Sequence, residues 1–263
     1  MKKLAIIRKA FEPITADAER DIELINHYAI KELSPEDVFC FNVVLCDNEI
    51  DRDIERIPDK SLADLAEMFV GKAGITDHDW EADNQIARVY RTEVIEREER
   101  NSVGEPLKQL VASVYMLAKN GKVPYIEAGI IKEVSVGFSA KVTRCSICGE
   151  PLIFDLYTCK ETCKNGHIKG ETYDGALCFG EIEDVTDAYE FSFVAVPAQR
   201  EAGVIKNAVD LGTAFEMLKT TSLDGYEKEI SELIPVLQMN LKQQEERKAR
   251  REISERNKKY LEE

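Results

Sequence analysis

The chain has 263 residues, is 44% hydrophobic, and carries 50 acidic against 35 basic side chains, a formal net charge of −15. This length allows a full core and fits one decorated domain or one domain plus a tail. No apolar run is long enough to span a membrane, and charges follow the start too soon for a signal peptide, so we expect a soluble, intracellular protein. The acidic charge argues against nucleic acid as a general partner, because phosphate binding needs a concentrated basic face.

The first part of the chain predicts a helix that leads into a buried strand. Apolar side chains in residues 16–32 recur near a helical period, and residues 36–46 are rich in Val and Phe. Residues 47–60 are polar and charged, which predicts a surface loop. Ser61 is then expected to cap a helix over residues 62–70.

The middle of the chain predicts mainly strands. Residues 85–94 alternate apolar and polar side chains, residues 107–117 fit either a strand or a helix, and residues 124–131 predict a short helix. The clearest strands are residues 132–142 and 189–196, which are rich in Val and Phe and lack internal Pro. A segment rich in cysteine lies between these two strands.

The residues after 200 predict helices. Residues 204–219 fit one or two helices, and an apolar stripe from Leu223, interrupted at Pro235, continues into a highly charged end. The chain is therefore expected to comprise an N-terminal helical entry (1–37), a core (38–205) with a zinc-binding insert (143–180), a helical segment (206–222) and a charged helical tail (223–263).

The cysteines point to a metal site. In a chain without a sign of secretion, five cysteines within residues 145–178 indicate reduced thiols and a bound metal ion. Cys145-Ser-Ile-Cys148-Gly is typical of a zinc knuckle, in which two thiolates chelate one ion and the glycine lets the turn close.

Several residues compete for the other two ligand positions. Cys163 and His167 form a C-x3-H pair in a turn, which would complete a tetrahedral site most locally, while Cys159 and Cys178 are alternates. A site with three cysteines and one histidine has no open position for water. We therefore expect a zinc ion that stabilises the fold and does not act on substrate.

Of the three histidines, His78 is the candidate general base. His167 is assigned to the metal, and His27 lies on a predicted helix. His78 lies in the polar turn GITDHDW, where an imidazole can reach both solvent and a neighbouring side chain.

The order of four segments resembles the prohead proteases of tailed bacteriophages, the serine peptidases that mature capsids and are related in fold to the herpesvirus assemblins. The segments are DNEIDRDIERI, GKAGITDHDW, AGIIKEVSVGFSAK and DAYEFSFVAVPAQ, and the resemblance covers residues 38 to 205. It implies an α+β fold with a mostly antiparallel, partly closed β-barrel or sheet surrounded by helices. The cysteine-bearing insert is of a kind that some of these phage proteins have.

The resemblance also implies catalytic roles. Ser135 corresponds to the nucleophile and His78 to the base; EVSVG is not a G-x-S-x-G elbow, so the role of Ser135 depends on the resemblance. Assemblins use a second histidine as the third member, and Glu190 is the candidate here because a carboxylate can also orient the imidazole. Alternatives are Asp79, Asp184 and Asp187 for the third member and Ser192 for the nucleophile.

The loop after the last strand, around Ala198, Gln199 and Arg200, is expected to supply backbone amides for the oxyanion. The interval from Ser135 to Glu190 is longer than is usual in the family. The zinc-binding insert accounts for the excess if it extends from a hairpin between two neighbouring core strands.

The resemblance implies a serine endopeptidase that acts inside the prohead, in the host cytoplasm. Its substrates would be scaffold and major capsid proteins and the chain itself, the tail would bind scaffold, and residues 204–219 would contribute to a homodimer. The alternative is a non-catalytic, zinc-stabilised scaffolding or binding protein. A third reading, a zinc module that binds nucleic acid, is disfavoured by the acidic surroundings of the insert lysines.

Overall fold

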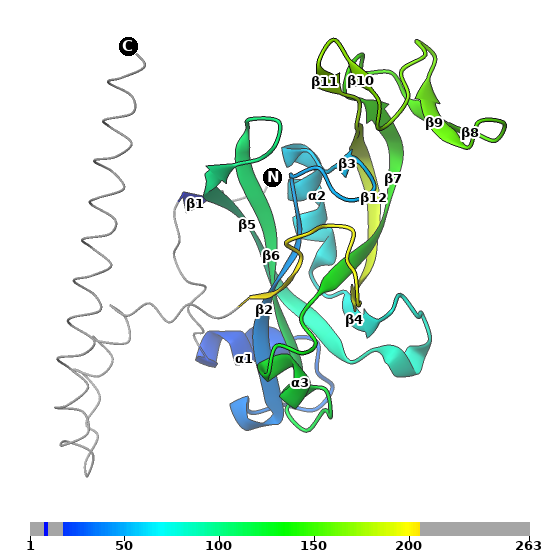
Figure 1. The fold of residues 1–263 in the computed structure, drawn as a ribbon. Coiled ribbons are helices and arrows are strands. Elements are labelled where there is room, and N and C mark those ends of the chain that lie inside the picture. Colours follow the sequence, from blue (N-terminus) through cyan, green and yellow to red (C-terminus); the bar gives the residue numbers. More distant parts are fainter. Residues whose placement is uncertain (1–7, 10–17, 206–263) are drawn as a thin grey trace, which may run out of the picture. The chain divides into compact units, whose positions relative to one another are not determined.

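The computed structural model describes residues 8–9 and 18–205. Most of the described elements are strands, accompanied by a few helices, so the expected α+β class is confirmed (Figure 1). The predicted segments 206–222 and 223–263 lie outside the described residues, as do most of the proposed dimer contacts. None of the helices in the described part is long and apolar enough to cross a membrane.

The elements follow one another in chain order from β1 to β13. They are β1 (Arg8–Lys9), α1 (Ala18–Asn26), the 3-10 helix η1 (Pro35–Asp37), β2 (Val38–Asp47), β3 (Glu55–Arg56), α2 (Asp59–Phe69), β4 (Ala73–Thr76), the 3-10 helix η2 (Ala82–Asn84), β5 (Ala87–Arg100), β6 (Pro106–Leu117), α3 (Val123–Glu127), β7 (Val134–Cys145), β8 (Leu152–Asp155), β9 (Lys160–Cys163), β10 (Thr172–Tyr173), β11 (Ala176–Leu177), β12 (Gly180–Phe193) and β13 (Gly203–Ile205).

Nine strands form one mixed sheet. Its main path is β13-β2-β6-β5-β4-β12-β3, with β7 paired to β12 and β1 paired to β5. Most pairs are antiparallel, but β12 runs parallel to both β3 and β4. The sheet is open, and only an isolated bridge between Glu133 and Gly203 brings the start of β7 beside β13. The described sheet is therefore not closed into a barrel.

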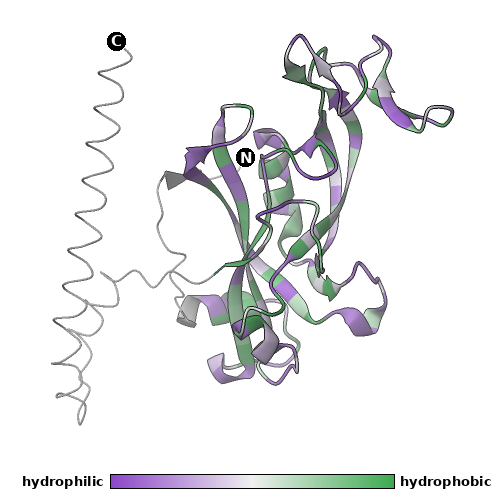
Figure 2. Ribbon diagram, viewed as in Figure 1, coloured by the Kyte–Doolittle hydropathy of each residue, from purple (hydrophilic) through white to green (hydrophobic). Residues whose placement is uncertain are grey.

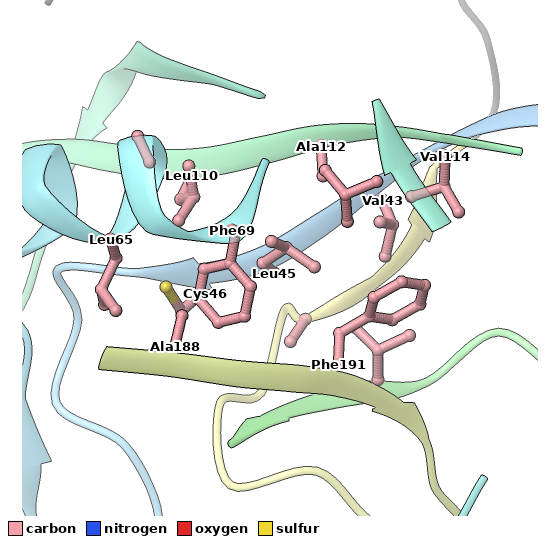
Figure 3. Close-up of a cluster of buried hydrophobic side chains, with 14 of the residues drawn as sticks. Val43, Leu45, Cys46, Leu65, Phe69, Leu110, Ala112, Val114, Ala188 and Phe191 are labelled. Carbon is pink, nitrogen blue, oxygen red and sulfur yellow. The ribbon is translucent and has the colours of Figure 1, made fainter. Parts of the chain in front are cut away.

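The core lies between helix α2 and the sheet (Figure 3). Leu65 and Phe69 of α2 are fully buried against Val43 and Leu45 of β2 and Phe191 of β12. Burying one such side chain stabilises the fold by about 1.5–3 kcal/mol. The apolar runs that predicted β2 and the end of β12 are therefore also the ones that pack. Figure 2 shows hydrophobic stretches, in green, on the strands and on helix α2.

Helix α2 begins earlier than predicted. Its N-cap is Pro58, and its first residue is Asp59. Ser61, the predicted cap, is a buried residue of the helix whose hydroxyl donates a hydrogen bond to the carbonyl of Ile182 on β12 (2.8 Å). Ser61 therefore ties the helix to the sheet instead of starting it.

Several other boundaries differ from those expected. Residues 107–117, which fitted either element, form strand β6. The strand predicted at 189–196 begins at Gly180 and ends at Phe193. In its first half, buried side chains alternate with exposed ones, and many of the exposed ones are acidic. A search for continuous apolar runs does not detect a strand of this composition.

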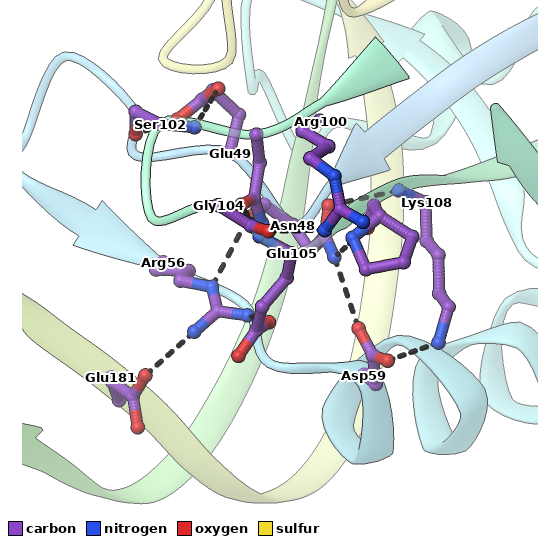
Figure 4. A network of polar contacts seen from close by, with 12 residues as sticks. Asn48, Glu49, Arg56, Asp59, Arg100, Ser102, Gly104, Glu105, Lys108 and Glu181 are labelled. Carbon is purple, nitrogen blue, oxygen red and sulfur yellow. Dashed lines mark hydrogen bonds and ion pairs between the residues drawn. The ribbon is translucent and has the colours of Figure 1, made fainter. Parts of the chain in front are cut away.

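The loop between β2 and α2 is more buried than its polar sequence suggested (Figure 4). Asn48 is fully buried, and its side-chain amide donates to Asp59 and to the carbonyl of Pro106 at 3.0 Å each. Arg56 is 5% exposed and pairs with both Glu105 and Glu181. These contacts tie the loop to the β5–β6 hairpin, helix α2 and strand β12.

Replacing Asp47 with asparagine is expected to stabilise the protein at neutral and alkaline pH. Asp47 is 2% exposed, and burial raises the pKa of its carboxyl from 3.8 to about 6, against a hydrogen bond from the Glu49 amide. Folding therefore favours the protonated acid, and this contribution is lost as the pH rises through about 6. Asparagine should raise the free energy of unfolding at pH 8 by about 2–3 kcal/mol.

Urea denaturation between pH 4 and pH 8 measures this effect. The gain from Asp47→Asn should shrink toward zero as the pH falls to 4. The exposed Asp53→Asn is the matched control and should change little at either pH. A gain that is equal at both ends of the range would show that ionisation of Asp47 is not its cause.

Candidate functional site

Three neighbouring strands, β7, β12 and β4, bring the candidate catalytic residues together. Ser192 of β12 lies directly opposite Ser135 of β7 and beside Ile75 of β4. His78 follows the end of β4 by two residues. The sheet topology thus places residues from three distant segments within one small region, with Ser192 in the middle.

His78 and Glu190 are in direct contact. The Nδ1 atom of His78 lies 2.8 Å from Oε1 of Glu190. The glutamate side chain is 5% exposed, whereas the imidazole is 42% exposed. A carboxylate on Nδ1 fixes the imidazole so that Nε2 is free to accept a proton. Oε2 of Glu190 is buried without a hydrogen-bond partner among the described residues, so His78 is the main group that compensates this carboxylate.

The backbone at His78 has an unusual conformation. Asp77 and His78 have φ angles of 53° and 54°, in the left-handed region that residues other than glycine seldom adopt. The amide of His78 donates a hydrogen bond to Oγ of Ser192 (2.8 Å). Ser192 therefore holds the turn that aims the imidazole at Glu190. This role of Ser192 depends on strand register and was not foreseen from the sequence.

Ser192 itself is fully buried, which disfavours it as a nucleophile. Ser135 is partly exposed. Because directly opposite residues of an antiparallel pair share a face, Ser135 lies on the same side of the sheet as Ser192 and Glu190. No hydrogen bond joins Ser135 to His78 in the described structure; such contacts are often long without substrate and shorten in the complex.

Gly137 makes room for the carboxylate of Glu190. The two residues are directly opposite each other on β7 and β12. A Cβ atom at position 137 would lie 2.4 Å from Oε1 of Glu190 and 3.2 Å from its Cδ. A glycine inside a strand can mark such a close approach, and this was the available sequence signal for it.

Gly137→Ala is expected to displace Glu190 and weaken its contact with His78. We expect a loss of about 1–3 kcal/mol in the free energy of unfolding from the steric overlap. If the pair is catalytic, the rate should also fall, by about 100-fold. Denaturation together with an activity assay measures both effects. Gly121→Ala is the control, because no atom lies within 4 Å of its added methyl group; equal behaviour of the two variants would contradict this role of Gly137.

The loop after β12 returns beside Ser135. The amide of Val134, the residue before Ser135, donates to the carbonyl of Ala202 (3.3 Å). The side chain of Gln199 accepts from the Asp47 amide, and that of Arg200 donates to the Ile50 carbonyl. In the described residues, the backbone amides of Gln199 and Arg200 donate no backbone hydrogen bond, so they suit the predicted oxyanion role.

The alternative third members have other partners. Asp187 pairs with Lys72 (3.1 Å), and Asp184 lies 3.7 Å from Lys60. Asp79 is exposed and accepts a hydrogen bond from the Glu81 amide. Glu190 is thus the carboxylate that the structure places against His78.

The predicted metal ligands form a cluster in the insert. The donor atoms of Cys145, Cys148, Cys163 and His167 all lie within 4.8 Å of one another. Cys148 and Cys163 sulfurs are 3.6 Å apart, as are the Cys145 sulfur and Nδ1 of His167. A tetrahedral zinc ion with bonds of about 2.1–2.3 Å separates its ligand atoms by roughly 3.4–3.8 Å. The cluster therefore has the composition and spacing to bind a metal ion.

The two alternate cysteines differ. Cys159 is exposed and lies outside the cluster, so the rival Cys159/Cys163 pair is wrong. Cys178 is fully buried, with its sulfur 3.6 Å from that of Cys145. Burial raises the pKa of Cys178 to about 12, whereas a hydrogen bond from the Glu150 amide lowers that of Cys148 to about 6. Cys148 is thus suited to bind as a thiolate, whereas burial raises the pKa of both Cys163 and Cys178, so these shifts do not distinguish the two.

The metal cluster and the His78–Glu190 pair are far apart. β7 and β12 pair along their length, from Ser192 opposite Ser135 to Gly180 opposite Cys145, and the insert forms the end of this long hairpin (Figure 1). The insert therefore does extend from a hairpin of core strands, as expected. Ten residues of strand separate Gly180 from Glu190, or about 30 Å. A metal ion at the cluster therefore cannot contact His78 or a peptide bond held beside it.

No model of a known protein family matches this chain, and no curated protein or solved structure is significantly similar to it.

Proposed function

We propose that this chain is a serine endopeptidase with Ser135 as nucleophile, His78 as base and Glu190 as the residue that orients the base. The contact between His78 and Glu190 carries the proposal, because the imidazole is partly exposed and the carboxylate is almost fully buried. A partly exposed serine on the same face of the sheet supplies the third component.

In this mechanism, Oγ of Ser135 attacks the carbonyl carbon of a peptide bond while its proton passes to Nε2 of His78. The Gln199 and Arg200 amides would stabilise the oxyanion. The imidazolium then gives its proton to the leaving amine as the C–N bond breaks, leaving an acyl-enzyme. Water, deprotonated by His78, attacks the ester and restores the Ser135 hydroxyl as the carboxylate product leaves.

Burial strengthens the part that Glu190 plays. A carboxylate shielded from water attracts a neighbouring imidazolium more strongly than an exposed one does. Because its Oε2 atom has no other described partner, protonation of His78 would compensate a buried charge. The pair is therefore arranged to stabilise the positive charge that develops on the imidazole during attack.

For the biological role, we propose maturation of a phage prohead, as the resemblance implies. The substrates would be scaffold and major capsid proteins and the chain itself, cut by a homodimer inside the prohead in the host cytoplasm, with nucleic acid and membrane excluded as partners. The metal would be a structural zinc ion in the insert. Support for this role comes from the EVSVGF segment, which begins β7, and the EFSFVAVPA segment, which forms the end of β12 and the start of the loop after it.

Co-expression of the chain with its proposed major capsid and scaffold substrates tests this role. Wild type should convert the scaffold to fragments on a gel, and Ser135→Ala should leave it intact. Ser139→Ala is the control, since Ser139 lies on the same strand but pairs with Thr186 (2.7 Å). Scaffold removal by Ser135→Ala at the wild-type rate would refute the proposal.

A second candidate is a non-catalytic, zinc-stabilised scaffolding protein. The observation in its favour is an exposed apolar group at the tip of the insert: Ile153, Phe154, Leu156 and Tyr157 are 54–100% exposed. Such groups often mark protein contacts. This candidate predicts that Leu156→Ser with Tyr157→Ser disturbs capsid assembly while Ser135→Ala has no effect, the reverse of the pattern expected for the peptidase.

A further inference from the structure

Two exposed aromatic side chains lie beside His78 and Glu190. Trp80 is 67% exposed and Tyr189 is 41% exposed, and their ring centroids are 5.4 Å apart with planes inclined by 55°. Each is next to the candidate site in the chain: Trp80 follows His78 by two residues, and Tyr189 directly precedes Glu190. The Trp80–Tyr189 pair thus presents aromatic surface to solvent where a substrate would approach.

An irregularity in β12 accounts for the position of Tyr189. Ala188 is opposite Phe138 and Glu190 is opposite Gly137, so Tyr189 is an extra residue without a partner on β7. In a regular strand, neighbouring side chains point to opposite faces. The bulge breaks this alternation and redirects a side chain, as bulges near active sites often do. Tyr189 can therefore contact Trp80 while Glu190 contacts His78.

The surroundings of this pair are acidic. Asp77, Asp79 and Glu81 are exposed on the segment that carries Trp80, and Asp83 follows. Lys72, which directly precedes β4, pairs with Asp187 (3.1 Å). Aromatic faces attract cations, and long basic side chains can pack their methylene groups on a ring while the charge reaches a carboxylate. The combination fits lysine or arginine better than an acidic or a small apolar side chain.

We propose that the Trp80–Tyr189 pair binds a lysine or arginine side chain of the substrate, close to the bond presented to Ser135. This inference rests on the proposed peptidase function, because it assigns the pair to substrate recognition. The binding itself requires no catalysis. It makes Trp80 and Tyr189 determinants of specificity rather than catalytic residues.

The chain contains a single tryptophan, so the fluorescence of Trp80 reports directly on this site. The full chain, as wild type and as Ser135→Ala, is titrated with blocked pentapeptides Ala-Ala-X-Ala-Ala, where X is lysine, arginine, norleucine or glutamate. Lysine and arginine peptides should give a saturable change in emission. Norleucine, which has the same stem without the charge, should bind about fivefold more weakly, and glutamate should not bind.

Variants distinguish the contribution of the aromatic rings to peptide binding from that of the acidic side chains. Tyr189→Ala should weaken lysine-peptide binding about fivefold, and Asp79→Asn with Glu81→Gln should reduce the preference for lysine over norleucine peptides without abolishing it, because both rings remain. Tyr125→Ala, an exposed tyrosine on α3, is the control and should change nothing. Equal binding of lysine and norleucine by wild type, or no saturable response to any peptide, would overturn the inference.

The two proposals fail separately. Digestion of denatured casein by the same proteins reports on the peptidase. Binding of lysine peptides together with digestion that does not depend on Ser135 would retain the inference about the aromatic pair and reject the proposed nucleophile. Digestion that depends on Ser135, without any response of Trp80 to lysine peptides, would retain the proposed nucleophile and reject the inference about the aromatic pair.

Discussion

Replacing His78 with alanine is expected to lower the rate of casein hydrolysis by about 10⁴-fold. Without the imidazole, the proton of the Ser135 hydroxyl has no acceptor in the site, and a neutral serine is a poor nucleophile. Glu190→Gln should lower the rate by about 10² to 10⁴, because an amide can contact Nδ1 but cannot stabilise the imidazolium. The rates are measured from the release of labelled fragments at saturating casein.

The chain supplies a matched control for this comparison. His27 is an exposed histidine in the turn after α1, where it contacts Tyr28, and His27→Ala should keep the wild-type rate. Circular dichroism should show that all three variants remain folded, since the His27 and His78 side chains are exposed to solvent and glutamine has nearly the same size as the buried Glu190. A His78→Ala enzyme that keeps a tenth or more of the wild-type rate would contradict the assignment of the base.

Removing the zinc ion that we propose at the cysteine cluster is the second change for which we expect a large effect. Two close contacts within the cluster join thiol to thiol (Cys148 and Cys163) and thiol to imidazole (Cys145 and His167), and bringing these groups together without an ion provides little stabilisation. Binding of structural zinc contributes about 10–16 kcal/mol in small zinc modules. A chelator should therefore unfold the insert, seen as loss of one equivalent of zinc and rapid hydrogen exchange over residues 146–179.

Ligand variants identify the atoms that bind the ion. With cobalt in place of zinc, Cys163→Ser and His167→Ala should lose affinity by about 100-fold or more, whereas the exposed Cys159→Ser should not. Cys178→Ala should retain the spectrum of a site with three sulfurs and one nitrogen. If His167→Ala has no effect and Cys178→Ala destroys the site, Cys178 is the fourth ligand instead.

The sequence predicted the parts of this fold that have a simple pattern. The Val- and Phe-rich runs correctly indicated β2, β7 and the second half of β12, and the C-x2-C spacing indicated the metal cluster. The first half of β12 was missed because its side chains alternate between buried and exposed positions, and many of the exposed ones are acidic. A run of apolar residues is a sign of burial on both faces and cannot reveal such a strand.

The candidate site was harder to predict from the sequence. Glu190 and His78 are 112 positions apart, and their contact depends on β4 and β7 flanking β12 in one register. A shift of one residue would turn Glu190 to the core face. The pairing came from a resemblance, not from spacing, and the roles of Gly137 and Ser192 require the register itself. The bulge at Tyr189 has no sequence pattern that we could recognise.

The most direct test of this account is covalent labelling with a fluorophosphonate, which reacts with an activated serine. Peptide mapping by mass spectrometry should find one adduct, on Ser135, in the wild-type protein and none in His78→Ala. An adduct on Ser192 or on Ser139, or equal labelling of Ser135 with and without His78, would contradict the proposed arrangement of nucleophile and base.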